Sequence, residues 1–432
     1  MKNKLNITIA GLGTVGSDVI LYIEKNIKHL ERITNSKIYI GGICAKNKKK
    51  ERTFSISNYK WYNNPIKMIE DLNPDVFIEL MGHEKGISYK SIKFALKNKV
   101  NVITANKALI ANFGNEFIHI AEKNNVHFLF EAAVAGGIPI IKTIKESLII
   151  NKITKISGIL NGTTNYILTK MLENNFSFDE ALNNAKNKGY VEINPKIDID
   201  GIDSAHKLSI LTSLCFGLKF HKFSDIYKEG ISNIDHLDLK FALQLNLILK
   251  LLSVVELIDN KLIQYVKPIL VNKDSQIGQV TGVLNGIQIT TNELGKIFFE
   301  GPGAGGIATA SSIISDLKDI CINPPSLPMV IRYNDLSHIK NINILNLYSS
   351  FYIRLSVEDK HGVLAKITSL LKDNDISIET IIQKQNDINN NLIPVVITTH
   401  KTYYKNIIKS VDKIRKLKSI KHNPVVIQID KV

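Results

Sequence analysis

The sequence predicts an α/β protein that begins with a parallel β-sheet, continues through an α+β region and ends in a β-α-β-β-α-β unit. A short β-branched strand near the N-terminus runs into the glycine-rich segment GLGTVG and then into a helix-like segment. Strands and helices then alternate as far as residue 130, which is typical of a parallel sheet. The C-terminal region shows period-two strands separated by two amphipathic helical segments, and this pattern predicts a second, smaller α/β unit.

The composition is that of a globular protein. A chain of 432 residues with 44% hydrophobic and 22% charged residues has room for two or three domains. Its formal net charge of +15 invites a nucleic-acid interpretation. However, the lysines are spread along the chain, and no basic run is interleaved with aromatic residues as a single-strand groove requires. We therefore expect no nucleic-acid partner.

The cysteines and the apolar segments bear on the compartment. Cys44, Cys215 and Cys321 lie far apart, which excludes a disulfide framework and a cysteine zinc site and suits a reducing environment. The N-terminal apolar run is too short for a signal peptide. The longest apolar stretch, residues 241–258, is too polar for a membrane span because it contains Gln244, Asn246, Lys250 and Glu256. We expect a cytoplasmic protein without a membrane partner.

The first strand is predicted at Asn6–Ala10, and a glycine motif follows it directly. Gly11, Gly13 and Gly16 have the G-x-G-x-x-G spacing of a dinucleotide-binding fold. In that motif the first glycine makes the tight turn, the second admits the pyrophosphate, and the third lets the helix pack on the strand. The phosphates would bind the unpaired N–H groups at the helix N-terminus.

The second strand, predicted at Lys37–Ala45, bears on cofactor choice. A strong preference for NAD usually places an acid at the end of this strand, where it binds the ribose 2′-hydroxyl. Here the chain continues with the basic segment from Lys46 to Arg52, KNKKKER. Cations at this place favour a 2′-phosphate and hence NADP, although a solvated basic turn that accepts either cofactor stays open.

Three further strands are predicted at residues 75–80, 100–104 and 126–130, with helical runs such as Ser88–Lys97 between them. Thr104 closes the fourth strand, and Asn106 and Lys107 follow it. Ligands bind at the carboxyl ends of parallel strands, so we expect these side chains where cofactor and substrate meet. A plain polar turn is the alternative.

The middle region carries a cluster of acids with a lysine. Asp203 and Lys207 stand four apart on a predicted helix that follows Gly201, so they share a face. A zwitterionic substrate needs carboxylates for its ammonium group and an acid–lysine pair where a proton moves. A surface ion pair worth about 0.3–0.5 kcal/mol is the alternative.

Taken together, these segments resemble homoserine dehydrogenase, in its monofunctional form with a C-terminal ACT domain. The matching segments stand in the family's order between residues 5 and 320: GLGTVG, NVITANKALIA, FEAAVAGGIPII, GILNGTTNYIL, GYVE…GIDSAHKL, VTGVLNGI and GPGAGGIATASSIISDL. The resemblance implies a Rossmann-type domain at residues 1–135 that is completed by 300–320. A substrate-binding, catalytic and dimerisation domain at 136–299, a linker at 321–349 and a ferredoxin-like ACT domain at 350–432 would follow.

The resemblance also implies an activity and its residues. Members reduce L-aspartate 4-semialdehyde to L-homoserine with NADPH or NADH, and run the reverse, on the route from aspartate to threonine, methionine and isoleucine. By family logic Lys207 donates the proton, Lys107 lies near the reacting carbon and nicotinamide, and Asp203 lies near the reacting oxygen. Glu192 would bind the substrate ammonium and Asp198 would help to hold the site, with Lys107 also contacting the substrate.

The same resemblance implies cofactor, cation and effector sites. The cofactor would contact Gly11, Gly13, Thr14, Val15, Gly16, Lys46, Thr104, Lys107, Gly189 and Gly303. A sodium-type cation would bind Glu131 and the carbonyls of Val134, Gly136 and Ile138, where a tight strand-to-helix connection is the alternative. The ACT domain would bind a small amino acid, threonine by family logic, and the chain would form a homodimer or, through paired ACT domains, a tetramer. A dimerisation module without ligand stays open.

Two other functions stay open at this point. Asn194, which stands where the family usually has aspartate, motivates an amino-acid-sensing protein that keeps the fold and has lost the chemistry. The intact lysines and acids oppose this interpretation. A related dehydrogenase that acts on another amino-acid semialdehyde also fits, because Glu192 and Asp203 suit any substrate with an ammonium group.

Overall fold

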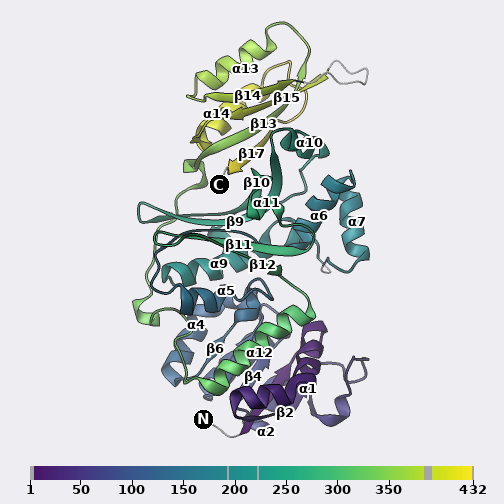
Figure 1. The fold of residues 1–432 in the computed structure, drawn as a ribbon, viewed down its shortest axis with the longest axis vertical. Helices are drawn as coiled ribbons and strands as arrows, with labels where there is room; N and C mark the ends of the chain where they lie inside the picture. Colours follow the sequence, from purple (N-terminus) through teal and green to yellow (C-terminus); the bar gives the residue numbers. More distant parts are fainter. Residues whose placement is uncertain (1–3, 192–193, 221–222, 384–391, 431–432) are drawn as a thin grey trace.

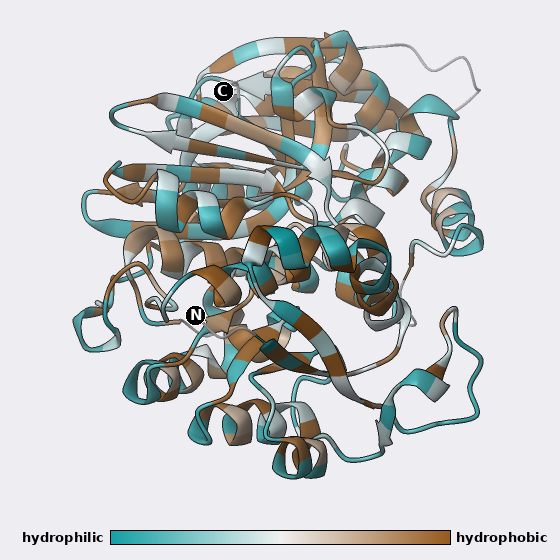
Figure 2. Cartoon of the chain, turned by 60° about the horizontal axis from the view of Figure 1, so that its bottom comes forward, coloured by the Kyte–Doolittle hydropathy of each residue, from teal (hydrophilic) through white to brown (hydrophobic). Residues whose placement is uncertain are grey.

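The computed structural model describes residues 4–191, 194–220, 223–383 and 392–430. Figure 1 shows an elongated molecule in three tiers, with the N-terminal unit at the bottom, a large mixed sheet across the middle and the C-terminal unit at the top. In Figure 2 helices and strands carry alternating hydrophobic and hydrophilic bands along their length, as amphipathic elements do. No helix among the described residues is long and apolar enough to cross a bilayer.

The N-terminal tier is a six-stranded parallel sheet in the order β3-β2-β1-β4-β5-β6, the strand order of a Rossmann fold. Its strands are β1 (Lys4–Ala10), β2 (Lys37–Cys44), β3 (Lys60–Tyr62), β4 (Val76–Glu79), β5 (Asn101–Thr104) and β6 (Phe128–Leu129). Its helices are α1 (Thr14–Thr34), α2 (Pro65–Leu72), α3 (Ile87–Lys97) and α4 (Lys107–Asn124). The chain returns to this tier with α12 (Gly306–Ile322), which packs against α1.

The turn from β1 to α1 requires the first glycine of its motif. Gly11 has φ of +100°, and a Cβ atom there would lie 2.3 Å from the backbone carbonyl of Leu80. The N–H of Gly11 donates to the Cys44 carbonyl at 3.0 Å, which ties the turn to the end of β2. Any side chain at Gly11 would therefore push β4 away from β1.

The middle tier is a mixed sheet with helices α6 (Gly162–Glu173), α7 (Phe178–Asn187), α8 (Lys196–Ile199), α9 (Ile202–Phe216), α10 (His236–Gln244) and α11 (Gln276–Gln279) around it. The strands are β7 (Ile153–Ile159), β9 (Leu247–Ile258), β10 (Lys261–Asn272), β11 (Leu284–Thr291) and β12 (Gly295–Pro302), with β8 (Tyr227–Lys228) beside β10. Helix α9 is buried along nearly its whole length. The short helices α5 (Ile140–Lys142) and 143–147 precede β7.

The C-terminal tier consists of β13 (Tyr348–Glu358), α13 (Val363–Lys372), β14 (Ile378–Gln383), β15 (Leu392–Thr399), β16 (Thr402–Tyr403), α14 (Tyr404–Arg415) and β17 (Val425–Asp430). Its last strand pairs in parallel with β10, with Ile269 opposite Gln428. The middle and C-terminal strands thus form one continuous sheet of 11 strands. Figure 1 shows β17 at this junction, between β10 and β13.

The predicted fold class is confirmed, and the differences are local. The fifth predicted strand, residues 126–130, shortens to Phe128–Leu129 because Phe130 leads into a 3₁₀ turn at Glu131–Ala133. The segment predicted as a linker, residues 321–349, contributes its first residues to α12 and its last to β13. Between them it pairs with the middle tier at Ser337 and Asn341, so it lies against the body of the molecule.

Candidate active site

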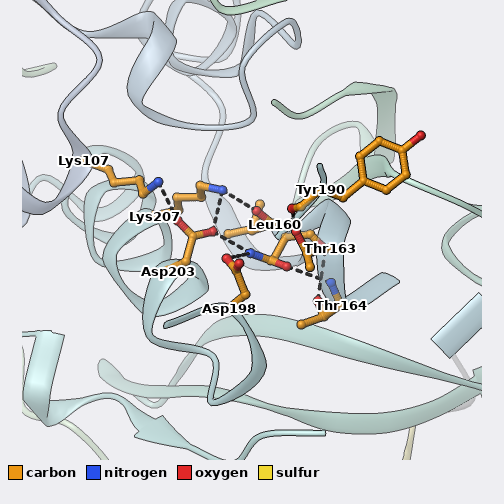
Figure 3. Close-up of polar contacts among 9 residues, drawn as sticks. Lys107, Leu160, Thr163, Thr164, Tyr190, Asp198, Asp203 and Lys207 are labelled. Carbon is orange, nitrogen blue, oxygen red and sulfur yellow. Dashed lines mark hydrogen bonds and ion pairs between the residues drawn. The ribbon is translucent and has the colours of Figure 1, made fainter. Parts of the chain in front are cut away.

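A carboxylate between two ammonium groups forms the centre of the site (Figure 3). Asp203 Oδ1 lies 2.7 Å from Lys107 Nζ, and Asp203 Oδ2 lies 2.7 Å from Lys207 Nζ. Lys207 Nζ also donates to the Leu160 carbonyl at 2.6 Å. The structure thus brings Lys107 on α4 to Asp203 and Lys207 on α9, which lie about 100 positions later in the sequence.

Burial makes this an unusual ion pair. Asp203 is 2% exposed and Lys207 is 7% exposed. The surface ion pair considered above is therefore wrong. Burial alone would raise the pKa of the Asp203 carboxyl, but Lys107 and Lys207 together hold that pKa far below its usual range. The carboxylate stays ionised and keeps both ammonium groups oriented.

The two lysines differ in access. The Lys107 side chain is 30% exposed, whereas that of Lys207 is 8% exposed and fixed by two acceptors. Lys207 lies one helical turn after Asp203 on α9, and α9 begins after Gly201, whose φ of +75° allows the sharp entry. The arrangement can therefore present one fixed and one accessible ammonium group to a polar reactant.

Asn161 connects the acids, and sequence reasoning assigned it no role. Its Nδ2 donates to Asp198 Oδ1 at 2.7 Å and to Asp203 Oδ2 at 3.0 Å. Its Oδ1 accepts the N–H of Thr164 at 2.9 Å and so caps the N-terminus of α6. One side chain therefore fixes the helix entry and holds two buried carboxylates at 3% and 2% exposure. The asparagine that precedes Gly162, at the end of a strand, was the available signal.

A buried carboxyl, that of Glu79, is connected by hydrogen bonds to the turn that precedes Lys107, and sequence reasoning missed this residue as well. Glu79, at the end of β4, is 0% exposed, and burial raises the pKa of its carboxyl. Its two oxygens accept the Met81 N–H at 2.9 Å and the Thr104 hydroxyl at 2.8 Å. The same hydroxyl accepts the N–H of Asn106 at 3.0 Å, and Asn106 Oδ1 caps α4 at the turn that starts with Lys107.

The remaining substrate-side residues lie beside this network. Thr163 Oγ1 donates to the Tyr190 carbonyl at 2.7 Å, which fixes the segment after α7 near Asn161. Gly189 precedes this contact, is exposed and has φ of +72°. Glu192, predicted to bind the substrate ammonium, lies outside the described residues.

A cavity of about 470 Å³ lies at the glycine turn of the parallel sheet. Of the predicted cofactor residues, Gly11, Gly13 and Lys46 line it. Lys50 and Arg52 line it too, and the Arg52 guanidinium lies 5.1 Å from the Trp61 ring while donating to the Lys50 carbonyl at 2.7 Å. No carboxylate is among the described residues that line this cavity, which suits an anionic ligand.

The other predicted cofactor residues lie outside this lining, namely Thr14, Val15, Gly16, Thr104, Lys107, Gly189 and Gly303. Gly16 has a packing role, because a Cβ atom there would lie 1.9 Å from the Gly11 carbonyl oxygen. Gly303 lies between Gly136 and the Asn285 side chain, where a Cβ atom would lie 1.9 Å from Asn285 Cγ. Gly303 therefore connects the returning chain to the middle tier.

The predicted cation residues adjoin a separate cluster of charges. Both Glu131 carboxylate oxygens accept backbone N–H groups, from Ile141 at 2.9 Å and Lys142 at 2.8 Å. Lys142 Nζ lies 3.2 Å from Asp316 and 2.5 Å from Asp319 on α12. Burial, together with Asp316, raises the pKa of Glu131 to about 7, and burial raises that of Asp316 to about 6.

Two of the predicted carbonyl ligands have hydrogen-bond donors. The Gly136 carbonyl accepts from Ser312 Oγ at 2.6 Å, and the Ile138 carbonyl accepts from the Ile140 N–H at 2.8 Å. No group of three histidine, cysteine or acidic side chains among the described residues forms a metal site. The Val134 backbone is buried in the same connection.

Comparisons with known proteins agree along the chain. Residues 11–131 match the family model "Homoserine dehydrogenase, NAD binding domain", residues 139–317 match "Homoserine dehydrogenase", and residues 351–415 match "ACT domain". The chain is 34% identical to the homoserine dehydrogenase of Neisseria gonorrhoeae, over 99% of this chain and 98% of that protein. It is 34% identical to that of Helicobacter pylori over the full length of both.

Solved structures agree with the fold. A homoserine dehydrogenase from Thiobacillus denitrificans superimposes with a TM-score of 0.93 at 31% identity, covering 100% of this chain and 99% of that one. A hyperthermophilic archaeal homoserine dehydrogenase in complex with NADPH superimposes with a TM-score of 0.64 at 29% identity, covering 75% of this chain and 99% of that one. By these family models, relatives and solved structures, the chain belongs to the homoserine dehydrogenase family of nicotinamide-dinucleotide-dependent oxidoreductases that act on a CH–OH group.

Proposed function

We propose that this protein catalyses the NADPH- or NADH-dependent reduction of L-aspartate 4-semialdehyde to L-homoserine and the reverse oxidation. The observation that carries the proposal is the buried Asp203 carboxylate with Lys107 and Lys207 each 2.7 Å away, in a chain of this family. Reduction of an aldehyde builds negative charge on its oxygen, and ammonium groups both stabilise that charge and supply a proton.

The roles assigned here are those that the family resemblance implies, and the geometry supports them. A bound nicotinamide supplies or accepts the hydride. Lys207, held by Asp203 and the Leu160 carbonyl, donates its proton to the alkoxide and takes it back in the oxidation. Lys107, with its more exposed ammonium, stabilises the oxygen from the side of the nucleotide domain. Asp203 remains ionised throughout and keeps both lysines in place.

The substrate ammonium group requires acids on the other side. Asp198 is 3% exposed, and Asn161 holds it next to Asp203. It would therefore form part of the surface that the substrate contacts. Glu192 would bind the ammonium group from the segment that follows Tyr190. The acids and lysines together match a small substrate that carries an ammonium group and a polar, reacting oxygen.

The cofactor is expected to be NADP in preference to NAD. Lys46, Lys50 and Arg52 line the cavity at the glycine turn, and cations there favour the extra 2′-phosphate. The archaeal relative in complex with NADPH agrees with this choice. Equal catalytic efficiency with NADP and NAD would contradict the preference.

A monovalent, sodium-type cation is part of the proposal. A cavity of about 280 Å³ is lined by four carboxylates, those of Glu131, Glu146, Asp316 and Asp319, and by the ammonium groups of Lys142 and Lys145. The raised pKa of Glu131 shows that burial leaves its charge incompletely compensated. Glu131, with the carbonyls of Val134, Gly136 and Ile138, would hold the cation in the connection that precedes α5, where its role would be structural.

The C-terminal tier is expected to bind an amino-acid effector, threonine by the family's logic, as a feedback inhibitor. The ACT match to residues 351–415 supports an effector of this class. We expect a homodimer through the middle tier, or a tetramer if ACT tiers pair, in the cytoplasm. Size-exclusion chromatography with light scattering distinguishes dimer from tetramer.

The test of the activity is the oxidation of L-homoserine by the purified protein with NADP or NAD at alkaline pH, followed in the near-ultraviolet band of reduced nicotinamide. We expect cofactor reduction, and a loss of about 10³-fold or more in kcat for Lys207→Ala with little change in NADP affinity. Lys170→Ala, which removes a lysine of the partly exposed pair with Glu173, is the matched control and should retain activity within about twofold. A Lys207→Ala protein with wild-type turnover would overturn the mechanism.

A further inference from the structure

A further lysine is buried inside the middle tier, apart from the two at the proposed catalytic centre. Lys250, on β9, is 2% exposed. Its Nζ donates to the Val280 carbonyl at 2.5 Å and to Asn165 Oδ1 at 3.4 Å, and both acceptors are uncharged. Burial lowers the pKa of Lys250 to about 8, because the ammonium group has lost much of its hydration. An apolar side chain of similar length would avoid that cost. What Lys250 adds over such a side chain is therefore its two hydrogen bonds.

Lys250 and Asn165 together bind the backbone of residues 280–284, which connect α11 to β11. Asn165, on α6, is 1% exposed. Its Nδ2 lies within 3.1–3.3 Å of three carbonyl oxygens, those of Val280, Gly282 and Leu284. An amide nitrogen has only two N–H groups for three acceptors. Lys250 supplies the further donor to Val280, and it orients the amide by donating to Asn165 Oδ1. The two side chains thus satisfy buried carbonyls and fix the 280–284 segment.

The 280–284 segment lies directly against the first turn of α6. Gly162 is the first residue of that helix, and a Cβ atom on it would lie 2.4 Å from the Val283 carbonyl oxygen. The two backbones are therefore in close contact, and in a packed interior a shift of the segment moves the turn. Asn161 caps this turn, and its amide donates to Asp203 Oδ2 at 3.0 Å. A continuous set of contacts therefore leads from Lys250 to the carboxylate that orients both active-site lysines.

We propose that Lys250 is a positioning residue for the proposed reaction: it holds the 280–284 segment against α6 and so keeps the Asn161 amide in place on Asp203. The inference rests on the proposed function only for its effect on turnover, because the packing can be measured without substrate. A methionine at position 250 would fill the space but remove a donor from the Val280 carbonyl and from the Asn165 amide oxygen. The segment would then loosen, and the Asn161 amide would shift on Asp203.

Steady-state kinetics and cofactor binding separate this role from general stability. Lys250→Met should lower kcat for homoserine oxidation about 10- to 100-fold, because misplacement by about 1 Å costs about 10²-fold in rate. The Kd for NADPH, measured by fluorescence titration, should not change, since no residue of the 280–284 segment is among the described residues that line the cavity at the glycine turn. A loss of NADPH affinity in proportion to kcat would overturn the inference.

Lys267→Met is the matched control. Lys267, on β10, is also 2% exposed, and burial lowers its pKa to about 8 as well. Its ammonium group lies 4.7 Å from the centre of the Tyr404 ring in the C-terminal tier, so it does not hold the 280–284 segment. Lys267→Met should therefore keep kcat near the wild-type value. Wild-type kcat in folded Lys250→Met, or an equal loss in Lys267→Met, would contradict the positioning role.

A double-mutant cycle tests whether Lys250 acts through Asn161. If it does, the variant that carries both Lys250→Met and Asn161→Ala should have the kcat of Asn161→Ala alone, within about twofold. Independent damage at two places would instead multiply the two losses. Multiplied losses would overturn the proposed connection.

Hydrogen–deuterium exchange read by mass spectrometry tests the packing without turnover. In Lys250→Met, the amides of residues 161–166 and 280–284 should exchange about tenfold faster or more than in the wild type, and Lys267→Met should leave both segments unchanged. Unchanged exchange in Lys250→Met would overturn the inference. An inactive wild type whose Lys250→Met variant shows the faster exchange would contradict the proposed function alone.

Gly162→Ala disturbs the same contact from the side of the helix, because its Cβ atom meets the Val283 carbonyl. This variant serves as the test if Lys250→Met does not fold. It should lower kcat and speed exchange in the same two segments. Wild-type kcat and wild-type exchange in Gly162→Ala would show that the 280–284 segment does not position α6, and the inference would then be wrong.

Discussion

The buried Asp203 carboxylate requires nearby hydrogen-bond donors and cations to offset the cost of its desolvation. A carboxylate that is 2% exposed has lost most of its hydration, and desolvation of this kind costs several kcal/mol per ion (roughly) unless good ion pairs offset it. Two ammonium groups at 2.7 Å and the Asn161 amide at 3.0 Å supply that compensation. The proposed mechanism assigns the proton transfer to the same lysines, so stability and the proposed catalysis would constrain the same side chains.

At the same scale, Glu79 is expected to act as a positioning residue for Lys107. Replacing it with alanine removes the acceptor for the Thr104 hydroxyl and the Met81 N–H, and so loosens the turn that starts α4. Misplacement by about 1 Å costs about 10²-fold in rate. We therefore expect Glu79→Ala to lower kcat about 10- to 100-fold while the KM for homoserine changes little.

The measurement is steady-state kinetics with homoserine and NADP, together with Glu79→Gln and Glu79→Asp. Glu79→Gln keeps the shape and should recover most of the activity if position is what matters. Glu116→Ala, which removes a more exposed carboxylate of α4 paired with Lys93, is the control and should have little effect. Equal activity of Glu79→Ala and the wild type would contradict the positioning role.

Single residues were predictable where spacing alone brings them together. The four-residue interval from Asp203 to Lys207 was enough to place both on one face of α9. The approach of Lys107 needed the family resemblance, because α4 and α9 meet only in the folded chain. Glu79 and the Leu160 carbonyl carried no usable sequence signal, since their roles depend on burial and on backbone direction.

Among the elements, the 3₁₀ turn at Glu131–Ala133 packs against α5 and α12, and the carboxyl of Glu131 in this contact should respond to pH. Glu131, with a folded pKa of about 7, titrates well above the unfolded value of about 4.3. A raised folded pKa means that the stability from this carboxyl is fully present below about pH 4 and is lost as pH rises through about 7. Without alkali-metal ions, the free energy of unfolding should therefore fall by about 1–3 kcal/mol more in the wild type than in Glu131→Gln between pH 5 and 8.

Urea unfolding at several pH values, in buffers with only organic cations, measures this difference. Adding sodium should reduce the fall in the wild type, because a bound cation compensates the ionised carboxylate, and should have little effect on Glu131→Gln. Parallel pH profiles for the two proteins with and without sodium would contradict both the titration and the cation.

A second contact between elements joins the two upper tiers. Asp238 on α10 is 1% exposed and accepts from Arg354 on β13 at 2.6 and 3.0 Å, and from the Tyr352 hydroxyl at 3.0 Å. Removing Arg354 would leave the carboxylate buried with its charge uncompensated, which costs about 3–5 kcal/mol. Arg354→Leu should therefore lower the stability of the full chain by about that amount, read from urea or thermal unfolding.

The activity of folded Arg354→Leu at moderate temperature should remain near that of the wild type, because Asp238 lies apart from the catalytic residues in sequence and in its contacts. Arg415→Leu, which removes an exposed arginine of α14, is the matched control and should change stability by less than about 1 kcal/mol. A variant of Arg354 that unfolds like the wild type would show that the contact carries no net energy.

The element pattern was the most predictable part of the molecule. The glycine turn, the alternating strands of the N-terminal tier and the β-α-β-β-α-β order all follow from local periodicity. The parallel pairing of β17 with β10 does not, because nothing in residues 425–430 indicates an external partner.

At the scale of the whole molecule, the continuous sheet is what distinguishes this chain from two domains on a linker. β17 pairs with β10 on one side and with β13 on the other, so the C-terminal tier covers an edge of the middle-tier sheet. An open edge with a row of unpaired N–H and C=O groups invites association with another strand. The C-terminal tier therefore has a structural role in addition to any role in binding an effector.

This predicts the result of a truncation. A chain ending at residue 346 loses β17 and with it the cover of β10, including the pairs of Ile269, Leu270 and Val271. We expect lower soluble yield, concentration-dependent association and a Tm reduced by several degrees (about 4 °C or more), even though the catalytic residues remain. Light scattering and thermal unfolding measure this, and Lys413→Ala in the full chain, at an exposed position of α14 that leaves β17 intact, is the control. A truncated chain that stays monodisperse and has the Tm of the full chain would show that β10 does not depend on the C-terminal tier. Stabilisation of the middle tier by the C-terminal tier would then have to come from the contact of Asp238 with Arg354.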